Sequence, residues 1–141
     1  MRAEIEQTVA QIETSLELLR QRMGWETAQH RLEEFNARVE DPNLWDDPAK
    51  AQKLMRERQA LVDAIDTHDG IKQEMSDNLE LVELGEMEDD AEVVADAEGA
   101  ILALAKKAAA KELEALLNGC LLRIANCSVL LFHDDNAPSL P

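Results

Sequence analysis

Apolar residues recur every three or four positions through most of the chain. The first run reads Ile5, Val9, Ile12, Leu16, Leu19 and Met23, with polar residues, many of them Glu or Gln, between them. Alternating spacings of three and four are typical of the seam of a coiled coil. Gly24 interrupts the run, so we expect a first helix that breaks or kinks near this glycine.

A second run of the same period follows, at Trp25, Ala28, Leu32, Phe35 and Val39. The residue before a proline disfavours helical backbone angles, so this helix should stop near Asp41, which precedes Pro42.

A short loop with a tryptophan separates the second helix from the third. Asp47 is suited to cap a helix and Pro48 to occupy its first position. Leu44 and Trp45 are the only large apolar residues in the loop. We expect Trp45 to fill the junction between the flanking helices, because burial of a large aromatic ring is strongly favourable. The alternative is that Trp45 binds a partner.

The third run predicts the longest helix, from Pro48 to Leu84, which would span about 55 Å at 1.5 Å per residue. Its predicted seam is Ala51, Leu54, Arg58, Leu61, Ile65, His68, Lys72, Met75, Leu79 and Val82. Three of these residues are polar, and long side chains at such positions can keep their charged ends in water. Gly70 should weaken the helix by about 1 kcal/mol relative to alanine.

An acidic turn, Gly85-Glu86-Met87-Glu88-Asp89-Asp90, precedes a fourth helix. It lacks the ligand spacing of a calcium loop and is expected to favour the start of the helix through the helix dipole. The fourth helix should run from about Ala91 to Leu117 and end at Asn118-Gly119. Its apolar positions are Val94, Ala97, Ile101, Leu104, Ala105, Ala108, Leu113 and Leu116.

These runs predict an all-α protein, an antiparallel bundle or coiled-coil-like hairpin of three to four long helices. The chain has two Phe, two Trp and no Tyr, so its core must be aliphatic. Residues 120–132 are apolar with a single charge, and a tail, residues 133–141, follows. We therefore divide the chain into a helical domain, residues 1–119, and a segment of different character, residues 120–141.

Charge and residue usage exclude several classes of function. With 14 basic and 30 acidic residues, the net charge of −16 disfavours nucleic-acid binding by a charged face and favours basic protein partners. Cys120 and Cys127 fit neither a metal site nor a disulfide framework and are expected to be free thiols of a cytoplasmic protein. Neither a secretory signal nor a membrane span is expected.

No catalytic, cofactor-binding or metal-binding residue is predicted. The glycines are scattered, and neither GxSxG nor HExxH occurs. His30, His68 and His133 fall in separate elements. His68 lacks a second ligand at helical spacing, and a Cys127–His133 nucleophile would lack an orienting third group. We therefore expect the chain not to be an enzyme.

Three segments together resemble the N-terminal domain of the bacterial peptide chain release factor 2 family. They are RLEEFNA at residues 31–37, DPNLWDDP at residues 41–48 and AQKL at residues 51–54. In that family a helix of this type leads into a DP-x-x-W-x-x-P loop and a long helix. The acidic turn and the LLNG sequence at residues 116–119 also fit, so the resemblance covers roughly residues 1–119.

The resemblance implies a role in translation termination at UAA and UGA codons, where the family triggers hydrolysis of peptidyl-tRNA. The N-terminal domain of the family projects towards the GTPase-associated region and stalk base of the ribosome. The codon-reading Ser-Pro-Phe and the Gly-Gly-Gln loop lie in later domains, and neither sequence occurs in this chain. The resemblance therefore implies a ribosome-interaction or protein-interaction module without release activity.

After Gly119 the sequence departs from the strand and glycine-rich segment of the family. We interpret the chain as a truncated product whose residues 120–141 come from a shifted reading frame. An alternative is a generic acidic coiled-coil structural or interaction protein, whose seam could pair between chains in a homodimer. This seam consists of Ile5, Val9, Ile12, Leu16 and Leu19. In either case the apolar residues 129–132 would favour some self-association.

Overall fold

The computed structural model describes residues 2–134, with side chains described for residues 2–117. These residues form four α-helices and one short 3₁₀ helix, with no strand among them. The elements are α1 (Ala3–Met23), α2 (Trp25–Val39), η1 (Pro42–Asp46), α3 (Pro48–Met87) and α4 (Ala91–Asp134). The predicted all-α fold is confirmed.

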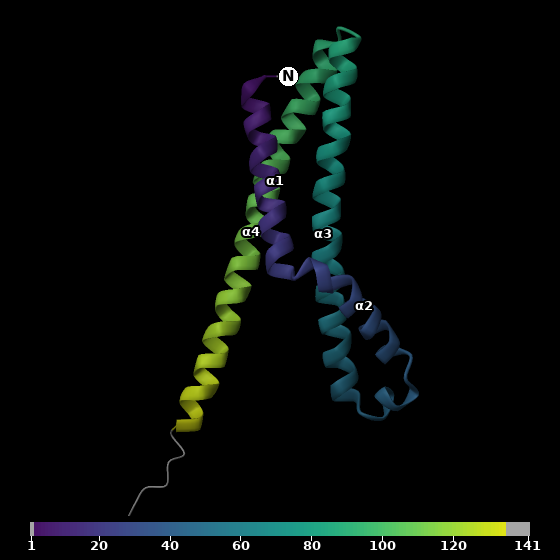
Figure 1. The fold of residues 1–141 in the computed structure, drawn as a ribbon, viewed down its shortest axis with the longest axis vertical. Helices are drawn as coiled ribbons and strands as arrows, with labels where there is room; N and C mark the ends of the chain where they lie inside the picture. The colour runs from purple at the N-terminus through teal and green to yellow at the C-terminus, as the bar shows by residue number, and fades with distance from the viewer. Residues whose placement is uncertain (1, 135–141) are drawn as a thin grey trace, which may run out of the picture.

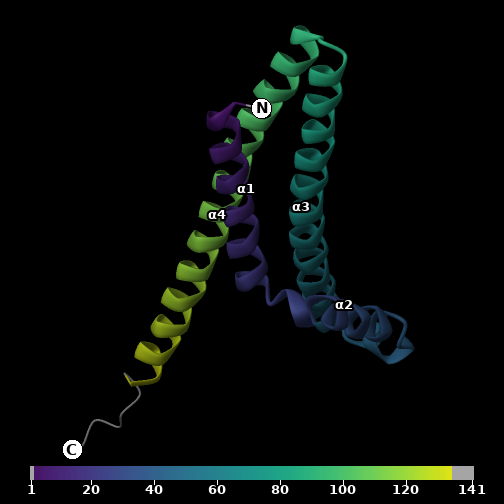
Figure 2. The same ribbon diagram turned by 45° about the horizontal axis from the view of Figure 1, so that its top comes forward.

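The helices form two packed units that share α3. α3 and α4 run antiparallel from a tight turn, and α1 lies along α4 and against α3 (Figure 1). α2 instead packs on the N-terminal half of α3 and forms a second hairpin with it. α3 and α4 diverge away from their shared turn in both views (Figure 2), so the α2–α3 hairpin, closed at its end by η1, projects to one side.

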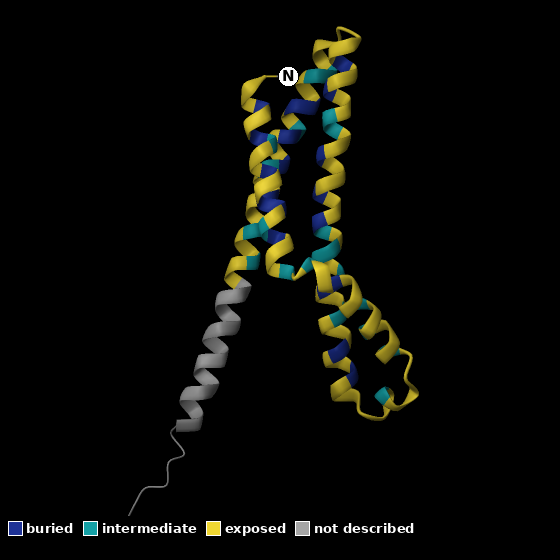
Figure 3. Ribbon diagram, viewed as in Figure 1, coloured by how far each residue is buried: buried dark blue, intermediate teal, exposed yellow. Residues whose placement is uncertain are grey.

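The main core lies where α1, α3 and α4 meet, and its buried positions form an inward stripe on each helix (Figure 3). It is aliphatic, as the composition predicts. Its members are Ile5, Ile12, Leu16, Ile71, Met75, Val82, Ala97, Ile101, Leu104 and Ala108. A smaller buried set lies where α2 meets α3, and it comprises Ala28, Ala51, Leu54 and Leu61.

The predicted break at Gly24 and the predicted cap at Asp47 are confirmed. Gly24 takes a left-handed conformation, with φ of 65°, and its N–H points to the carbonyl oxygens of Arg20 and Gln21. Glycine is the residue that adopts this conformation without strain, so α1 ends and α2 begins in one step. An Oδ1 atom of Asp47 accepts hydrogen bonds from the N–H groups of Ala49 and Lys50, at 3.2 and 3.3 Å.

The predicted seam of α3 is wrong by one residue at its centre. Lys72 is exposed, whereas Ile71 is fully buried. A strict alternation of three and four assumes one continuous partner, and a straight α-helix drifts relative to that repeat. α3 packs against α2 in its first half and against α1 and α4 in its second half. The side of the helix that is buried therefore changes near this point.

The predicted end of α4 is also wrong. The helix continues through Asn118 and Gly119 to Asp134. Glycine costs a helix only about 1 kcal/mol, and leucines flank this site on both sides. Leu113 and Leu116, predicted to face the core, are 56% and 36% exposed because α4 extends past α1. The side chains of Cys120, Cys127 and His133 lie outside the described residues.

Candidate functional site

The described part of the chain offers little for chemistry. Among these residues, no three His, Cys, Asp or Glu side chains come together in a way that could hold a metal ion. None of the described helices is long and apolar enough to cross a membrane. The surface hollows are open grooves, so the candidate site is sought as a surface that binds a partner.

Trp45 does not fill the junction between α2 and α3, contrary to the prediction. It is 56% exposed, and its neighbour Leu44 lines a hollow with Arg38 and Leu54 instead. A 3₁₀ helix has three residues per turn, so adjacent side chains point about 120° apart. Leu44 and Trp45 therefore cannot both face the junction, and Trp45 is turned towards solvent.

The exposed tryptophan forms one wall of an apolar groove at the start of α3. We call this the Trp45 groove, and it has a volume of about 530 Å³. Its lining residues are Trp45, Pro48, Ala51, Gln52, Met55 and Arg56. Sequence reasoning had singled out Trp45 but not Met55 or Arg56.

The loop that carries Trp45 is fixed at both ends by aspartate caps. Oδ1 of Asp41 accepts a hydrogen bond from the N–H of Asn43 at 3.0 Å, at the start of η1. Asp47 caps α3 on the other side. Each cap satisfies backbone donors that would otherwise be free at a helix start. The indole is therefore held on a short, well-anchored element.

Charge is distributed unevenly along α3. Residues 48–58 carry four basic residues and one acidic residue, whereas residues 73–98 carry eleven acidic residues and no lysine or arginine. Arg58 donates from Nε to Oδ1 of Asn36 at 2.7 Å. Lys53 and Arg56 make no ion pair or hydrogen bond through their side chains with any residue that the structure describes. The beginning of α3 is thus a basic region in an acidic protein, a signal already present in the sequence.

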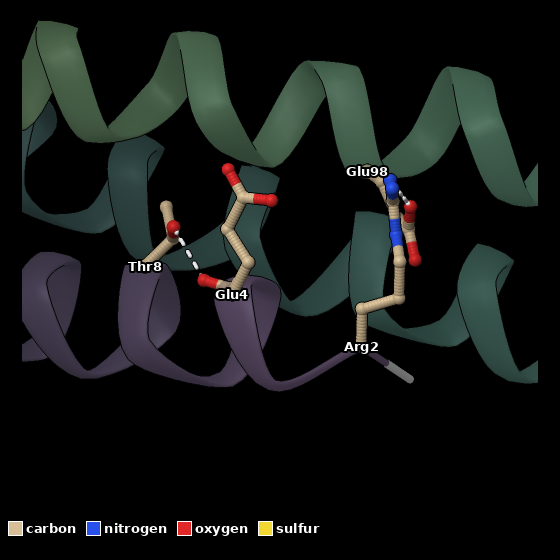
Figure 4. A network of polar contacts seen from close by, with 4 residues as sticks. All are labelled: Arg2, Glu4, Thr8 and Glu98. Carbon is tan, nitrogen blue, oxygen red and sulfur yellow. Dashed lines mark hydrogen bonds and ion pairs between the residues drawn. The ribbon is translucent and has the colours of Figure 1, made fainter.

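The acidic end of the molecule is stabilised by contacts from the N-terminus. The guanidinium of Arg2 donates to the carboxylate of Glu98 on α4 (Figure 4), and Glu98 is 3% exposed. This hydrogen bond and charge pairing raise the pKa of Arg2 above its ordinary value. In the same view, Thr8 Oγ1 donates to the backbone oxygen of Glu4 at 2.8 Å. The Arg2–Glu98 contact holds the start of α1 against α4, whereas the Thr8–Glu4 contact lies within α1.

His68, the histidine considered as a possible ligand, lies in a structural junction. It is buried in the middle of α3, and its ring centroid is 4.5 Å from that of Trp25. Its Nδ1 lies 3.0 Å from Oδ1 of Asp69. The guanidinium carbon of Arg20, near the end of α1, lies 5.5 Å from the centroid of the Trp25 ring at the start of α2. This arrangement joins the α1–α2 corner to α3.

Comparison with known proteins identifies related sequences. A family model described as the PCRF domain matches residues 28–126. Over 119 residues the chain is 71% identical to a protein named "Peptide chain release factor 2" from Ruegeria sp. (strain TM1040) and 70% identical to one of the same name from Roseobacter denitrificans. A third, from Paramagnetospirillum magneticum, is 48% identical over the same length. Each match covers 84% of this chain and 32% of the relative, so the chain spans about a third of the length of these curated relatives.

Proposed function

This chain belongs to the peptide chain release factor family, and from that premise we propose that it is the N-terminal helical module of a translation termination factor for UAA and UGA codons. The observation that carries the proposal is the 71% identity to a bacterial release factor 2 across the helical domain. The family match runs from Ala28 in α2 through η1 and α3 to residue 126 and so includes most of α4.

The module's proposed role is to bind the ribosome in the cytoplasm, at the GTPase-associated region or the stalk proteins. Its architecture supports this role, because two long-helix hairpins present extended surfaces and the described grooves are open. The acidic stretch at residues 73–98 would favour a basic protein surface and disfavour direct contact with phosphate backbones.

We further propose that this chain does not itself release the nascent peptide. Its sequence contains neither Ser-Pro-Phe nor Gly-Gly-Gln, the two segments that the family uses for codon reading and hydrolysis. In a longer protein of the family, the helices would instead position those two segments.

Two measurements on the full chain test the proposal. Sedimentation with purified ribosomes should show saturable binding, and a peptidyl-tRNA release assay at a UGA codon should show no release. Failure to sediment with ribosomes would refute the binding role, and peptide release by this chain would refute the absence of activity. The full-length relative serves as the positive control in both measurements.

The homodimer alternative receives less support. The seam proposed to pair between chains packs within one chain against α3 and α4. Its residues Ile5 and Ile12 are fully buried, and Val9 is partly buried. Self-association through the apolar residues 129–132 stays a prediction, because their side chains lie outside the described residues. Light scattering over a range of concentrations would measure it.

The division at residue 119 also remains a proposal. α4 passes this position without interruption, and the family match extends to residue 126. The change in composition after Gly119 supports a shifted reading frame from residue 120. Sequencing the encoding DNA tests this. A second frame that encodes a glycine-rich continuation is expected, and its absence would refute the frameshift.

A further inference from the structure

We propose that the Trp45 groove is a docking site for a short amphipathic protein segment that carries acidic residues along one edge. This inference goes beyond the proposed function, since it concerns the end of the molecule opposite to the acidic α3–α4 turn. It rests on the exposed side chains of the groove, on the local charge and on the rigidity of the loop.

The apolar part of the groove is costly to leave in water. Trp45 is 56% exposed and Met55 is 37% exposed, and both line one hollow together with Pro48 and Ala51. Tryptophan, methionine and arginine are the residue types enriched at protein interfaces, and tryptophan and arginine dominate their binding energy. All three types line this groove, with Arg56 at its edge.

The charge of the groove indicates an acidic partner. Arg56 lines the hollow, and Lys53 lies one turn before it on α3. Neither side chain pairs with any residue that the structure describes, so both cations are available to carboxylates of a partner. Arginine binds carboxylates through two parallel hydrogen bonds, which would fix the orientation of the docked segment.

A protein segment fits this surface better than a nucleic acid. Asp46 and Asp47 follow Trp45 in the sequence, and Asp41 lies at the other end of η1. A phosphate backbone carries a charge at every nucleotide and would be repelled by these carboxylates. A peptide can instead place an apolar side chain beside Trp45 and a carboxylate only where Arg56 lies.

The groove also exists before any partner arrives. Aspartate caps anchor η1 and the first turn of α3, and Pro48 fixes the backbone between them. A pre-organised surface loses little conformational entropy on binding. A partner therefore meets a backbone that is already in place, and the expected change on binding is in side chains alone.

Isothermal titration calorimetry on the full chain at 150 mM salt tests the proposal. At this salt concentration repulsion from charges more than about 8 Å away is screened, so the charges near the groove determine which peptide binds. Three synthetic amphipathic 16-residue helices share one leucine face and differ only along one edge of that face, where the residues are Glu, Gln or Lys. The other polar positions are Gln in all three. An oligouridine RNA is the fourth titrant. The Glu helix should bind, and the Gln helix, the Lys helix and the RNA should bind at least tenfold more weakly.

Variants then locate the binding. Trp45→Ala should weaken binding of the Glu helix at least tenfold, and Arg56→Glu should reverse the preference towards the Lys helix. Two matched controls lie on α4: Leu113→Ala, at a side chain equally exposed, and Lys106→Glu, at another exposed cation. Both controls should bind as the unchanged protein does. Circular dichroism confirms that each variant is folded.

Several results would overturn the proposal. They are equal or tighter binding of the Lys helix or the RNA, no binding of the Glu helix, or a Trp45→Ala variant that binds as well as the unchanged protein. None of these titrations uses ribosomes. Failure here therefore leaves the proposed function standing, and failure of ribosome sedimentation leaves this docking site standing.

Discussion

A β-carbon added at Gly85 would lie only 2.8 Å from Cγ2 of Val94. It would also lie 3.2 Å from the backbone oxygen of Asp90. The backbone of α3 at Gly85 therefore packs directly against the side chain of Val94 in the first turn of α4, with no room for a methyl group. This close approach permits the three-residue turn that joins the two longest helices, and Asp90 Oδ1 then accepts the N–H of Val93 at 3.2 Å to cap α4.

Gly85→Ala should destabilise the protein. Overpacking costs about 1–3 kcal/mol, and the better helix propensity of alanine returns about 1 kcal/mol, so we expect a net loss of up to about 2 kcal/mol. Urea unfolding followed by circular dichroism measures it. Gly70→Ala is the matched control, because nothing lies within 4 Å of its added β-carbon, and this variant should gain up to about 1 kcal/mol. A Gly85→Ala variant as stable as Gly70→Ala would contradict the close contact.

The two tryptophans should differ in their effect on stability. Trp25 is half-buried and packs on His68, so Trp25→Ala should cost about 2 kcal/mol, below the 3–5 kcal/mol of a fully buried aromatic residue. Trp45 is exposed, so Trp45→Ala should change the free energy of unfolding by less than about 0.5 kcal/mol. Chemical unfolding of both variants compares them directly. Equal losses would show that Trp45 is packed after all.

The centre of the bundle should be much more sensitive than the free part of α4. Ile101 is fully buried among α1, α3 and α4, and Ile101→Ala should cost about 2–5 kcal/mol. Leu113 is 56% exposed on the same helix, so Leu113→Ala should cost about 0.5 kcal/mol or less. Thermal unfolding would rank the two. A large loss at Leu113 would indicate that a second chain covers α4 in solution.

Removal of the aspartate cap should weaken the start of α3. Asp47→Ala leaves the N–H groups of Ala49 and Lys50 without their acceptor, and loss of such a cap costs about 1 kcal/mol. Asp46→Ala removes the same charge one residue earlier without removing the cap and should be close to neutral. Hydrogen exchange at residues 49–51 should increase in the first variant alone. Equal exchange in both would mean that charge, not capping, stabilises this turn.

Local signals in the sequence predicted most of the fold. Gly24, the Asp41-Pro42 pair and Asp47-Pro48 act through their own backbone geometry, so their effects were predicted correctly. The aliphatic period located the core on α1 and the first half of α4. The family resemblance added an identity that no periodicity could supply, and the comparisons confirm it.

The wrong predictions on Lys72 and Leu113 concern features that depend on distant parts of the chain, whereas those on Trp45 and on the end of α4 concern local backbone geometry. Ile71 replaces Lys72 in the core because α3 changes partners midway, which no local period contains. Leu113 is exposed because α1 ends before it can cover α4. Trp45 is exposed because η1 turns Leu44 inward instead. Met55 and Arg56 became candidates only when the groove brought them beside Trp45.

α3 serves both packed units, with 40 residues and a length of about 60 Å at 1.5 Å per residue. His68, clamped by Trp25, lies almost at its midpoint. His68 therefore divides α3 into two halves of nearly equal length. A tilt of about 5° at His68 would displace each end, about 30 Å away, by about 2–3 Å in opposite directions. A pull on the end that carries Trp45 would therefore reach the turn at Gly85 only by shifting Ile71, Met75 and Val82 against α1 and α4.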